Sequence, residues 1–195
     1  MRADARRNLD KIVTAAAAVV AERGIEAPME VIARRAGVGV GTLYRRFPDR
    51  NALIAALGDH YVHSLADALR RSEENVPDAW TALREHLTWT VDPGRGALAS
   101  AMAELPDEVF LDRPDFARAR GHWLEMLDAL VHRAQAEGAM RPDVTTEEVL
   151  ALLNLFACHP ADLPAAVAAR PARFLRLILD GLQATAATEP PTAPA

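Results

Sequence analysis

Cysteine is almost absent from the sequence, since Cys158 is the single cysteine among 195 residues. No disulfide can form within the chain, and we expect a cytoplasmic protein because disulfides are rare in that reducing compartment. Aromatic residues make up only 5% of the chain, and no long region alternates between apolar and polar residues with the period of a β-strand. These absences predict an all-α fold.

Long hydrophobic runs are also missing. The alanine-rich run at residues 12–21 follows a basic start, as in a signal peptide, but Glu22 and Arg23 come directly after it. A short amphipathic helix explains this pattern better, and no stretch reaches the roughly 20 apolar residues of a membrane-spanning helix. We therefore expect no membrane partner.

Recognisable sets of catalytic or metal-binding residues are absent as well. The sequence has neither a Gly-x-Ser-x-Gly elbow nor a His-Glu-x-x-His pattern. His60 and His63 have helical spacing, but no third ligand is near in sequence, which favours a surface pair over a metal site. Cys158 lies in an apolar run, where a lone cysteine more often packs than senses oxidants. We expect no catalytic residue, no metal and no cofactor.

Charge is unevenly distributed along the chain. The formal net charge of −5 argues by itself against a nucleic-acid-binding protein. Residues 1–50, however, hold ten basic and six acidic residues, a net charge of +4, and the remainder carries −9. This asymmetry suggests a basic nucleic-acid-binding domain attached to an acidic one.

The basic region contains two short segments with helical periodicity. Gly37 follows the first segment and is suited to end a helix, because glycine adopts the left-handed conformation at little cost. Gly39 is an acceptable N-cap for a second helix, which Pro48 would terminate. The first segment has one apolar face at i, i+3, i+4 and i+7, formed by Met29, Ile32, Ala33 and Ala36.

The second segment has two different faces. Leu43 and Phe47 are four residues apart on one face, which leaves a basic, hydroxyl-bearing face for solvent. Two short helices joined by a glycine turn, the second with such a face, are typical of a helix-turn-helix. The run of glycines at 37, 39 and 41 resembles a dinucleotide-binding loop only superficially, because helical periodicity replaces the β-strand that must precede such a loop.

The stretch from Ile32 to Leu53, IARRAGVGVGTLYRRFPDRNAL, resembles the DNA-binding segment of TetR (tetracycline-repressor-like) transcriptional regulators. The resemblance covers roughly residues 8–57. It implies an N-terminal three-helix DNA-binding domain followed by a larger helical domain for ligand binding and dimerisation. We expect these domains at 8–56 and 57–185, with a disordered Pro/Ala/Thr-rich tail at 186–195.

The same resemblance implies a repressor that a small-molecule inducer releases from a double-stranded DNA operator. At two positions where the family often reads bases, Gly39 and Val40 carry no hydrogen-bonding side chain. Base contacts would then shift to other residues or to the N-terminal arm. Ala27 also replaces the Ser or Thr cap expected before the second helix. The implied DNA-binding residues are Gly39, Val40, Thr42, Tyr44, Arg45, Arg46 and Arg50.

Periodicity and helix-ending residues predict helices along the whole chain. A loose basic arm, residues 1–7, is expected before the first helix. Apolar residues occupy two faces of the segment 78–91, which predicts a central helix flanked on both sides. The segment 149–158 is apolar almost all round and is expected to be buried on every side. The predicted helices span about 9–23, 28–36, 40–46, 50–72, 77–91, 97–105, 115–137, 146–158 and 171–184.

Aromatic residues and methionines of the second domain are candidates for the wall of a ligand pocket. Ordinary core packing is the simpler explanation for each of them, and both alternatives remain open. The pocket would be largely apolar, with His86 as its polar anchor and the ligand between His86, Trp89 and Trp123. The candidates are His86, Trp89, Met102, Phe110, Trp123, Met126 and Phe156.

The helices at 149–158 and 171–184 offer more apolar surface than one small domain can cover. We therefore expect a two-fold homodimer through these helices. Its candidate interface residues are Phe156, Phe174, Ile178, Gly181 and Leu182. The alternative from another class is a helical ligand carrier or enzyme in which the basic corner is incidental.

Overall fold

The computed structural model describes residues 2–92, 98–100, 102–103, 110, 113–159 and 162–184. This part of the chain is helical, with one isolated antiparallel bridge between Met140 and Gln183. The predicted all-α fold is confirmed. In chain order the elements are α1 (Arg2–Arg23), α2 (Met29–Ala36), α3 (Val40–Arg46), α4 (Arg50–Asn75), α5 (Ala79–Thr90), α8 (Pro114–Ala136), α9 (Thr146–Leu153), the π-helix η1 (Asn154–Cys158), α10 (Ala165–Ala168) and α11 (Pro171–Gly181).

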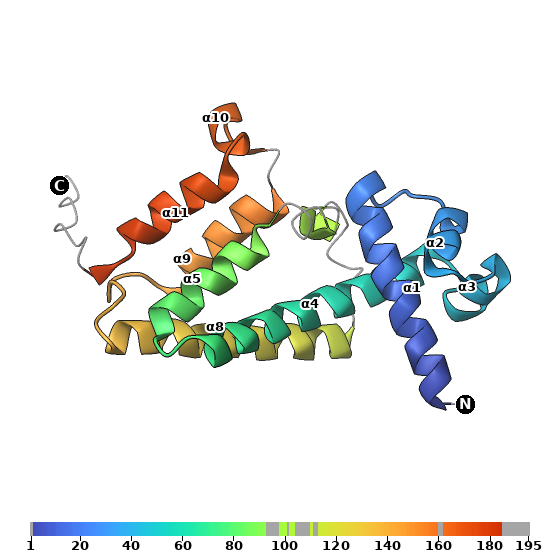
Figure 1. Ribbon diagram of the computed structural model, residues 1–195, viewed down its shortest axis with the longest axis horizontal. Coiled ribbons are helices and arrows are strands. Elements are labelled where there is room, and N and C mark those ends of the chain that lie inside the picture. The colour runs from blue at the N-terminus through green and yellow to red at the C-terminus, as the bar shows by residue number, and fades with distance from the viewer. Residues whose placement is uncertain are drawn as a thin grey trace.

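The elements form two groups, and α4 reaches into both of them (Figure 1). At one end, α1, α2 and α3 pack with the start of α4 around the N-terminal core. The apolar stripes predicted for these helices are confirmed, because they supply its buried residues. That core comprises Ile12, Val13, Ala16, Val19, Val20, Ala27, Met29, Ile32, Ala33, Leu43, Phe47, Leu53, Leu57, Leu98 and Met102.

The second group is built on a layer formed by α4, α5 and α8, over which α9, η1 and α11 pack. Helix α5 contacts α4, α8 and α11, which confirms that it is central. The large side chains of this C-terminal core include Leu65, Leu69, Trp80, Leu83, Leu87, Trp123, Leu127, Leu130, Leu153, Phe156 and Leu175.

Three predicted helix boundaries are wrong by three residues or more, and one of them is the end of α4, which lies at Asn75 rather than near residue 72. Helix α1 begins at Arg2, so the expected loose arm at residues 1–7 is instead helical from Arg2. This segment holds alanine and arginine, which favour helix, and no glycine or proline that would prevent the helix from extending. Helix α11 ends at Gly181 rather than near residue 184, because the chain then turns to pair with Met140.

The segment 149–158 is not buried on every side, contrary to the prediction. It is divided into the end of α9 and the π-helix η1, whose Leu155 is 41% exposed. The start of α9 was predicted within one residue. Thr145 and Glu148 form a capping box there, since each side chain accepts the backbone N–H of the other.

Two other expectations concern residues that the structure describes only partly or not at all. The helix expected at 97–105 is seen at 98–100 and 102–103, and the expected disordered tail at 186–195 lies outside the described residues. Among the helices that the structure describes, none combines the length and apolar character needed to cross a membrane.

Gly58 of α4 lies at the boundary between the two cores. A Cβ atom there would lie 2.6 Å from Cε1 and 2.9 Å from Cδ1 of Phe110, whose ring packs against Phe116 with 5.1 Å between centroids. We expect Gly58→Ala to lower the free energy of unfolding by about 1–3 kcal/mol, because the added methyl group overpacks this contact.

Chemical denaturation measures this loss, and the matched control is Gly121→Ala in α8. A Cβ at Gly121 meets open space, so alanine there should be neutral or stabilising through its helix propensity. The loss at Gly58 should shrink in a Phe110→Ala background. An equal loss in both backgrounds would contradict the clash.

Candidate nucleic-acid interface and internal cavity

The turn between α2 and α3 has the predicted glycine geometry. Gly37 is left-handed, with φ of 68°, and its N–H donates to the Arg34 carbonyl at 3.2 Å. The Val38 N–H donates to the Ala33 carbonyl at 3.0 Å, so the last turn of α2 is closed by hydrogen bonds. Gly39 is extended, and its carbonyl accepts the Thr42 N–H at 2.8 Å to begin α3. The angle between the two helices is therefore set by local backbone bonds.

Helix α3 presents the two faces that its sequence predicts. Leu43 and Phe47 are buried in the N-terminal core. Tyr44 is 42% exposed, and Arg45 and Arg46 are exposed as well. Figure 1 places α3 at the far end of the molecule from α11, where a long partner has room to approach. A hydroxyl-bearing basic surface on a short, firmly packed helix is suited to enter a nucleic-acid groove.

The arginines near this surface have different roles. Arg45 Nη2 donates to Thr42 Oγ1 at 3.1 Å, and Arg46 forms no ion pair with any residue that the structure describes. Arg35 instead pairs with Glu22 at 2.7 Å, an exposed contact between α2 and α1 that lowers the pKa of Glu22. Arg45 and Arg46 are therefore the arginines available to a partner across the surface of α3.

Arg50 differs from the other predicted DNA contacts because it is directed toward the protein. Its Nη1 donates to the Ile25 carbonyl, and its Nη2 donates to the Glu26 carbonyl at 3.4 Å. These bonds tie the start of α4 to the loop between α1 and α2. Ala27 in this loop is buried, and Pro28 caps α2 without a side-chain hydrogen bond, as expected from the missing Ser or Thr.

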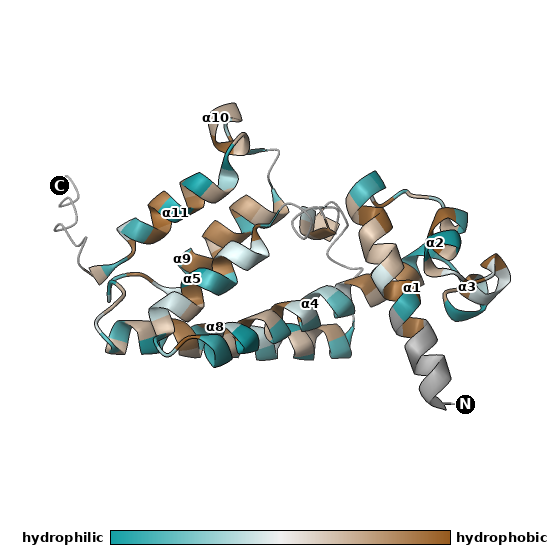
Figure 2. Cartoon of the chain, viewed as in Figure 1, coloured by the Kyte–Doolittle hydropathy of each residue, from teal (hydrophilic) through white to brown (hydrophobic). Residues whose placement is uncertain are grey.

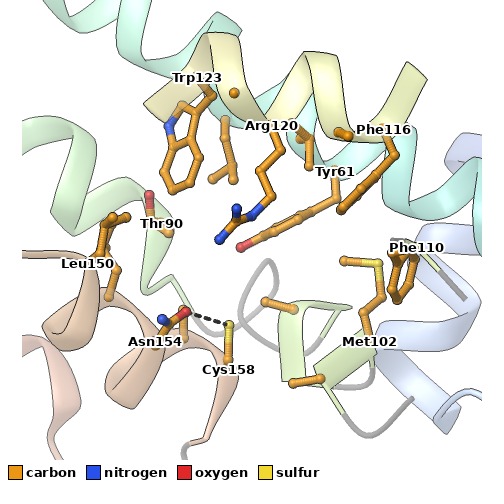
Figure 3. A pocket seen from close by; sticks show the side chains of 18 residues that line it. Tyr61, Thr90, Met102, Phe110, Phe116, Arg120, Trp123, Leu150, Asn154 and Cys158 are labelled. Atoms are coloured by element: carbon orange, nitrogen blue, oxygen red, sulfur yellow. Dashed lines mark hydrogen bonds between the residues drawn. The ribbon is translucent and has the colours of Figure 1, made fainter. Parts of the chain in front are cut away.

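A cavity of about 530 Å³ lies within the second group of helices. Its walls come from α4, α5, α8, α9, η1 and the residues described between 99 and 110 (Figure 3). Three of the seven candidate ligand-binding residues lie on its wall, namely Met102, Phe110 and Trp123. Its volume is within the range of small-molecule sites.

The other candidates do not line this cavity. His86 is fully buried behind Trp123, whose Nε1 donates to His86 Nε2 at 3.3 Å. Met126 and Phe156 pack against or within the C-terminal core. Trp89 lines a separate shallow groove on the other side of α5.

This cavity is therefore not bounded by the predicted set of His86, Trp89 and Trp123, since only Trp123 lies on its wall. On α5, the residue that reaches the cavity one turn after His86 is Thr90, not Trp89. Thr90 donates from its hydroxyl to the His86 carbonyl at 2.9 Å, which satisfies that group inside the core. The helix brings positions i and i+4 to one face, and the adjacent tryptophan falls outside it.

Several lining residues were not singled out from sequence as ligand contacts. They include Tyr61, Phe116, Arg120, Leu150 and Asn154. On α8 a signal was available, because Phe116, Arg120 and Trp123 have the i, i+4, i+7 spacing of one helix face. Arg120 itself is exposed, so this face of α8 meets solvent at the mouth of the cavity.

The polar side chains of the cavity are neutral apart from Arg120. Burial raises the pKa of the Tyr61 hydroxyl and also that of the Cys158 thiol, so both keep their protons at neutral pH. Cys158 Sγ lies 3.8 Å from Asn154 Oδ1. Searching the described residues reveals no group of three or more His, Cys, Asp or Glu side chains placed to hold a metal ion.

The cavity adjoins the N-terminal core through a short segment of the chain. Met102 lines the cavity and is also a buried member of the N-terminal core, beside Leu98. Phe110 lines the cavity and packs against the same core. Ala99, between Leu98 and Met102 in the chain, belongs to the C-terminal core. Residues of the cavity wall are thus in direct contact with the helices that support α3.

A helix-turn-helix with an exposed basic second helix, joined to a helical domain that encloses a cavity, defines a DNA-binding regulator. Residues 12–57 match the family described as bacterial regulatory proteins of the tetR family, and residues 77–184 match the C-terminal domain of SbtR-like transcriptional regulators. The chain belongs to the TetR family of transcriptional regulators. This family match does not favour the alternative of a carrier or enzyme with an incidental basic corner.

Solved structures of similar proteins agree with this assignment. The TetR transcriptional regulator SCO0520 from Streptomyces coelicolor is 33% identical, with 90% of this chain and 98% of that chain covered and a TM-score of 0.67. A TetR regulatory protein from Mycobacterium vanbaalenii is 31% identical, with 93% and 98% covered and a TM-score of 0.70. The HTH-type regulator YvdT of Bacillus subtilis (strain 168) is 33% identical over 75 residues, so the chain spans about two fifths of that relative's length.

His86 provides a test of the buried contact behind the cavity. Indole N–H groups only donate, so His86 Nε2 accepts from Trp123, and Nδ1 carries the proton without a partner in the described part of the chain. Burial lowers the pKa of His86 to about 4, from an ordinary value near 6.5. The unfolded chain therefore takes up a proton before the folded chain does as the pH falls.

We expect this histidine's contribution to stability to be complete above about pH 6.5 and to be lost progressively down to about pH 4. Between about pH 7 and pH 5 the loss should be roughly 2 kcal/mol. Denaturant unfolding at several pH values measures it, and His86→Gln, which cannot titrate, should lose that part of the dependence. An unchanged pH dependence in this variant would contradict a buried neutral His86.

Proposed function

We propose that the chain represses transcription by binding an operator as a homodimer, and that a small molecule in the cavity releases it. The observation that supports this most directly is the shared position of Met102. Its side chain belongs to the N-terminal core and also lines the cavity. A ligand that displaces Met102 or Phe110 would therefore disturb the packing on which the DNA-binding helices rest.

Helix α3 is the element that would enter the major groove. Thr42, Tyr44, Arg45 and Arg46 offer hydroxyl and guanidinium groups on or beside its exposed face, whereas Gly39 and Val40 offer no polar side-chain atom. Arginine contacts to phosphates supply affinity that is independent of sequence, and hydroxyl or guanidinium contacts to base edges supply specificity. We propose that Arg50 acts indirectly, by holding the start of α4 against the preceding loop.

Dimerisation would use the exposed apolar surface of α11 and η1. Leu177 is 55% exposed and Leu155 is 41% exposed, whereas the predicted Phe174, Ile178 and Leu182 are only partly exposed. Gly181 is exposed with open space above it, and Phe156 is buried within the chain instead. Figure 2 shows hydrophobic and hydrophilic residues alternating along α11, as expected for a helix with one apolar face against its own core and further apolar residues outside.

Release from DNA requires that the ligand has a higher affinity for the conformation that cannot bind DNA than for the conformation that can. A molecule with equal affinity for both states would shift nothing, however tightly it bound. In a dimer, the two copies of α3 must lie about 34–36 Å apart to enter successive major grooves of one DNA face. A modest rotation of each N-terminal bundle about α4 is enough to lose that spacing.

Arg45→Ala and Arg46→Ala test the proposed DNA surface. If each arginine holds a phosphate, each substitution should weaken binding to any duplex alike and reduce the slope of log affinity against log salt by about one. Fluorescence anisotropy with a labelled duplex of arbitrary sequence, measured across a salt series, gives both quantities. A loss confined to one base position would assign that arginine to base reading.

Arg118→Ala is the matched control, because Arg118 is an exposed arginine on α8 with a partner in Asp115 at 3.1 Å. It removes the same charge from the chain far from α3. If the control lowers the salt slope as much as Arg46→Ala does, α3 is not the DNA-binding surface.

Leu177→Glu and Gly181→Glu test the dimer surface. Both positions are exposed within one chain, so the substitutions should leave each chain folded. Placing a carboxylate in an apolar two-fold interface puts two like charges near each other without solvation, which should convert dimers to monomers. Sedimentation velocity measures the change, and circular dichroism checks the fold. Dimers that persist in both variants would place the interface elsewhere.

A further inference from the structure

The charge on the described wall of the cavity is positive only. Among the lining residues that the structure describes, Arg120 is the only charged residue, and aspartate and glutamate are both missing. The rest of the wall is mainly apolar, with a few hydroxyl, amide and thiol groups. A site of this kind repels cations and offers a single strong contact to an anion.

Arg120 is exposed at the mouth of the cavity, and its side chain is directed into the cavity rather than toward an acidic neighbour. Figure 3 shows its guanidinium extending from α8 into the space between Tyr61 and Trp123. Other arginines of α8 have partners, since Arg118 pairs with Asp115 at 3.1 Å and Arg133 pairs with Glu73. Arg120 forms neither an ion pair nor a hydrogen bond with any residue in the described part of the chain.

Tyr61 is a second donor beside Arg120. Its hydroxyl lies next to the Arg120 guanidinium in Figure 3 and has no hydrogen-bond partner among the described residues. Burial raises the pKa of this hydroxyl, so it stays protonated and can donate. Thr90, by contrast, already donates to the His86 carbonyl. The cavity therefore brings together two donors that have no partner among the described residues, one of them an exposed cation at its mouth, on a mainly apolar wall.

We propose that the cavity binds an amphipathic organic acid, with its carboxylate between Arg120 and Tyr61 and its apolar part against Phe116, Met102 and Leu153. This assignment rests on the proposed ligand-responsive function and adds the chemical class of the ligand. A carboxylate accepts from both donors, and hydrogen bonds between charged groups are about twice as strong as neutral ones. The apolar remainder of the acid gains from leaving water.

Other ligand classes fit the same wall less well. A sugar would bury many hydroxyl groups against apolar side chains, and each unpaired group costs free energy. An amine would bring a second positive charge toward Arg120 with no carboxylate among the described lining residues to offset it. A neutral lipophilic molecule would fill the space without gaining a contact to the positive charge of Arg120.

The test compares three probes with the same chain length and different head groups, namely decanoate, decanol and decylamine. Trp123 lines the cavity, so its fluorescence reports binding. Decanoate should bind at least about tenfold more tightly than decanol, the low end expected for one hydrogen bond to a charged group. Decylamine should bind more weakly than both. A second acid, 2-naphthoate, distinguishes a flat aromatic ligand from a straight chain by its affinity relative to decanoate.

Arg120→Gln should lower the affinity for decanoate by roughly tenfold and leave that for decanol nearly unchanged, while Arg120→Lys should retain part of the preference. Tyr61→Phe should weaken decanoate binding without altering the fold. Arg118→Gln, on the outer side of the same helix, is the matched control and should change neither affinity.

Two results would overturn the assignment. Either decanol binds as tightly as decanoate, or neither acid binds below its aggregation concentration. Release from a selected operator duplex is scored separately. If decanol releases the protein as well as decanoate does, regulation by a cavity ligand stands and only the acid preference fails. If the acids bind without release, the acid preference stands and the proposed induction fails.

Discussion

Burial of one helix in two separate cores is the constraint on which the rest of the structure depends. The first turns of α4 place Leu53 and Leu57 in the N-terminal core, and its later turns place Leu65 and Leu69 in the C-terminal core. Its 26 residues span about 39 Å at 1.5 Å per residue. A continuous hydrogen-bonded helix transmits rotation and translation between its ends, so neither bundle can move independently of it.

The start of α4 is fixed by polar contacts as well as by apolar burial. Asp49 accepts the Ala52 N–H at 2.8 Å, and Arg50 donates to the carbonyls of Ile25 and Glu26. Farther along, Asp59 pairs with Arg113 at 2.7 Å, immediately before α8 begins. Asp59 Oδ1 and Arg113 Nε are both buried without a partner in the described residues.

Local patterns in the sequence were sufficient for the all-α fold and for the buried and exposed faces of α3. Leu43 and Phe47 are buried because their spacing matches one helix face, and Gly37 ends α2 because the turn needs a positive φ. The role of Arg50 was not visible in the same way. Whether an arginine faces DNA or a backbone carbonyl depends on where the loop at Ile25 lies, and sequence spacing does not specify that position.

The residues that line the cavity could not be predicted from local patterns in the same way, because long-range packing determines which side chains reach it. Trp89 and Thr90 are neighbours in sequence, and only the rotation of α5 against α4 and α8 decides which one reaches the cavity. Tryptophan is the more conspicuous residue in a sequence, yet threonine lies on the wall. For α8 the local spacing of Phe116, Arg120 and Trp123 was informative. That Arg120 and Tyr61 line the same cavity, however, depends on how α8 packs beside α4, which local spacing does not specify.

The contact between the cavity and the N-terminal core has a physical consequence for signalling. Close-packed interiors do not deform continuously, so a side chain such as Met102 that is shared by two regions moves in discrete steps. Methionine is unbranched and adapts to irregular space, which allows it to change rotamer when a ligand occupies the adjacent volume. Phe110 has less freedom, because it is held against Gly58, where even a methyl group would clash. The space beside Met102 therefore has one adaptable wall and one rigid wall, and a molecule placed there would displace the adaptable side, toward Leu98 and the N-terminal core.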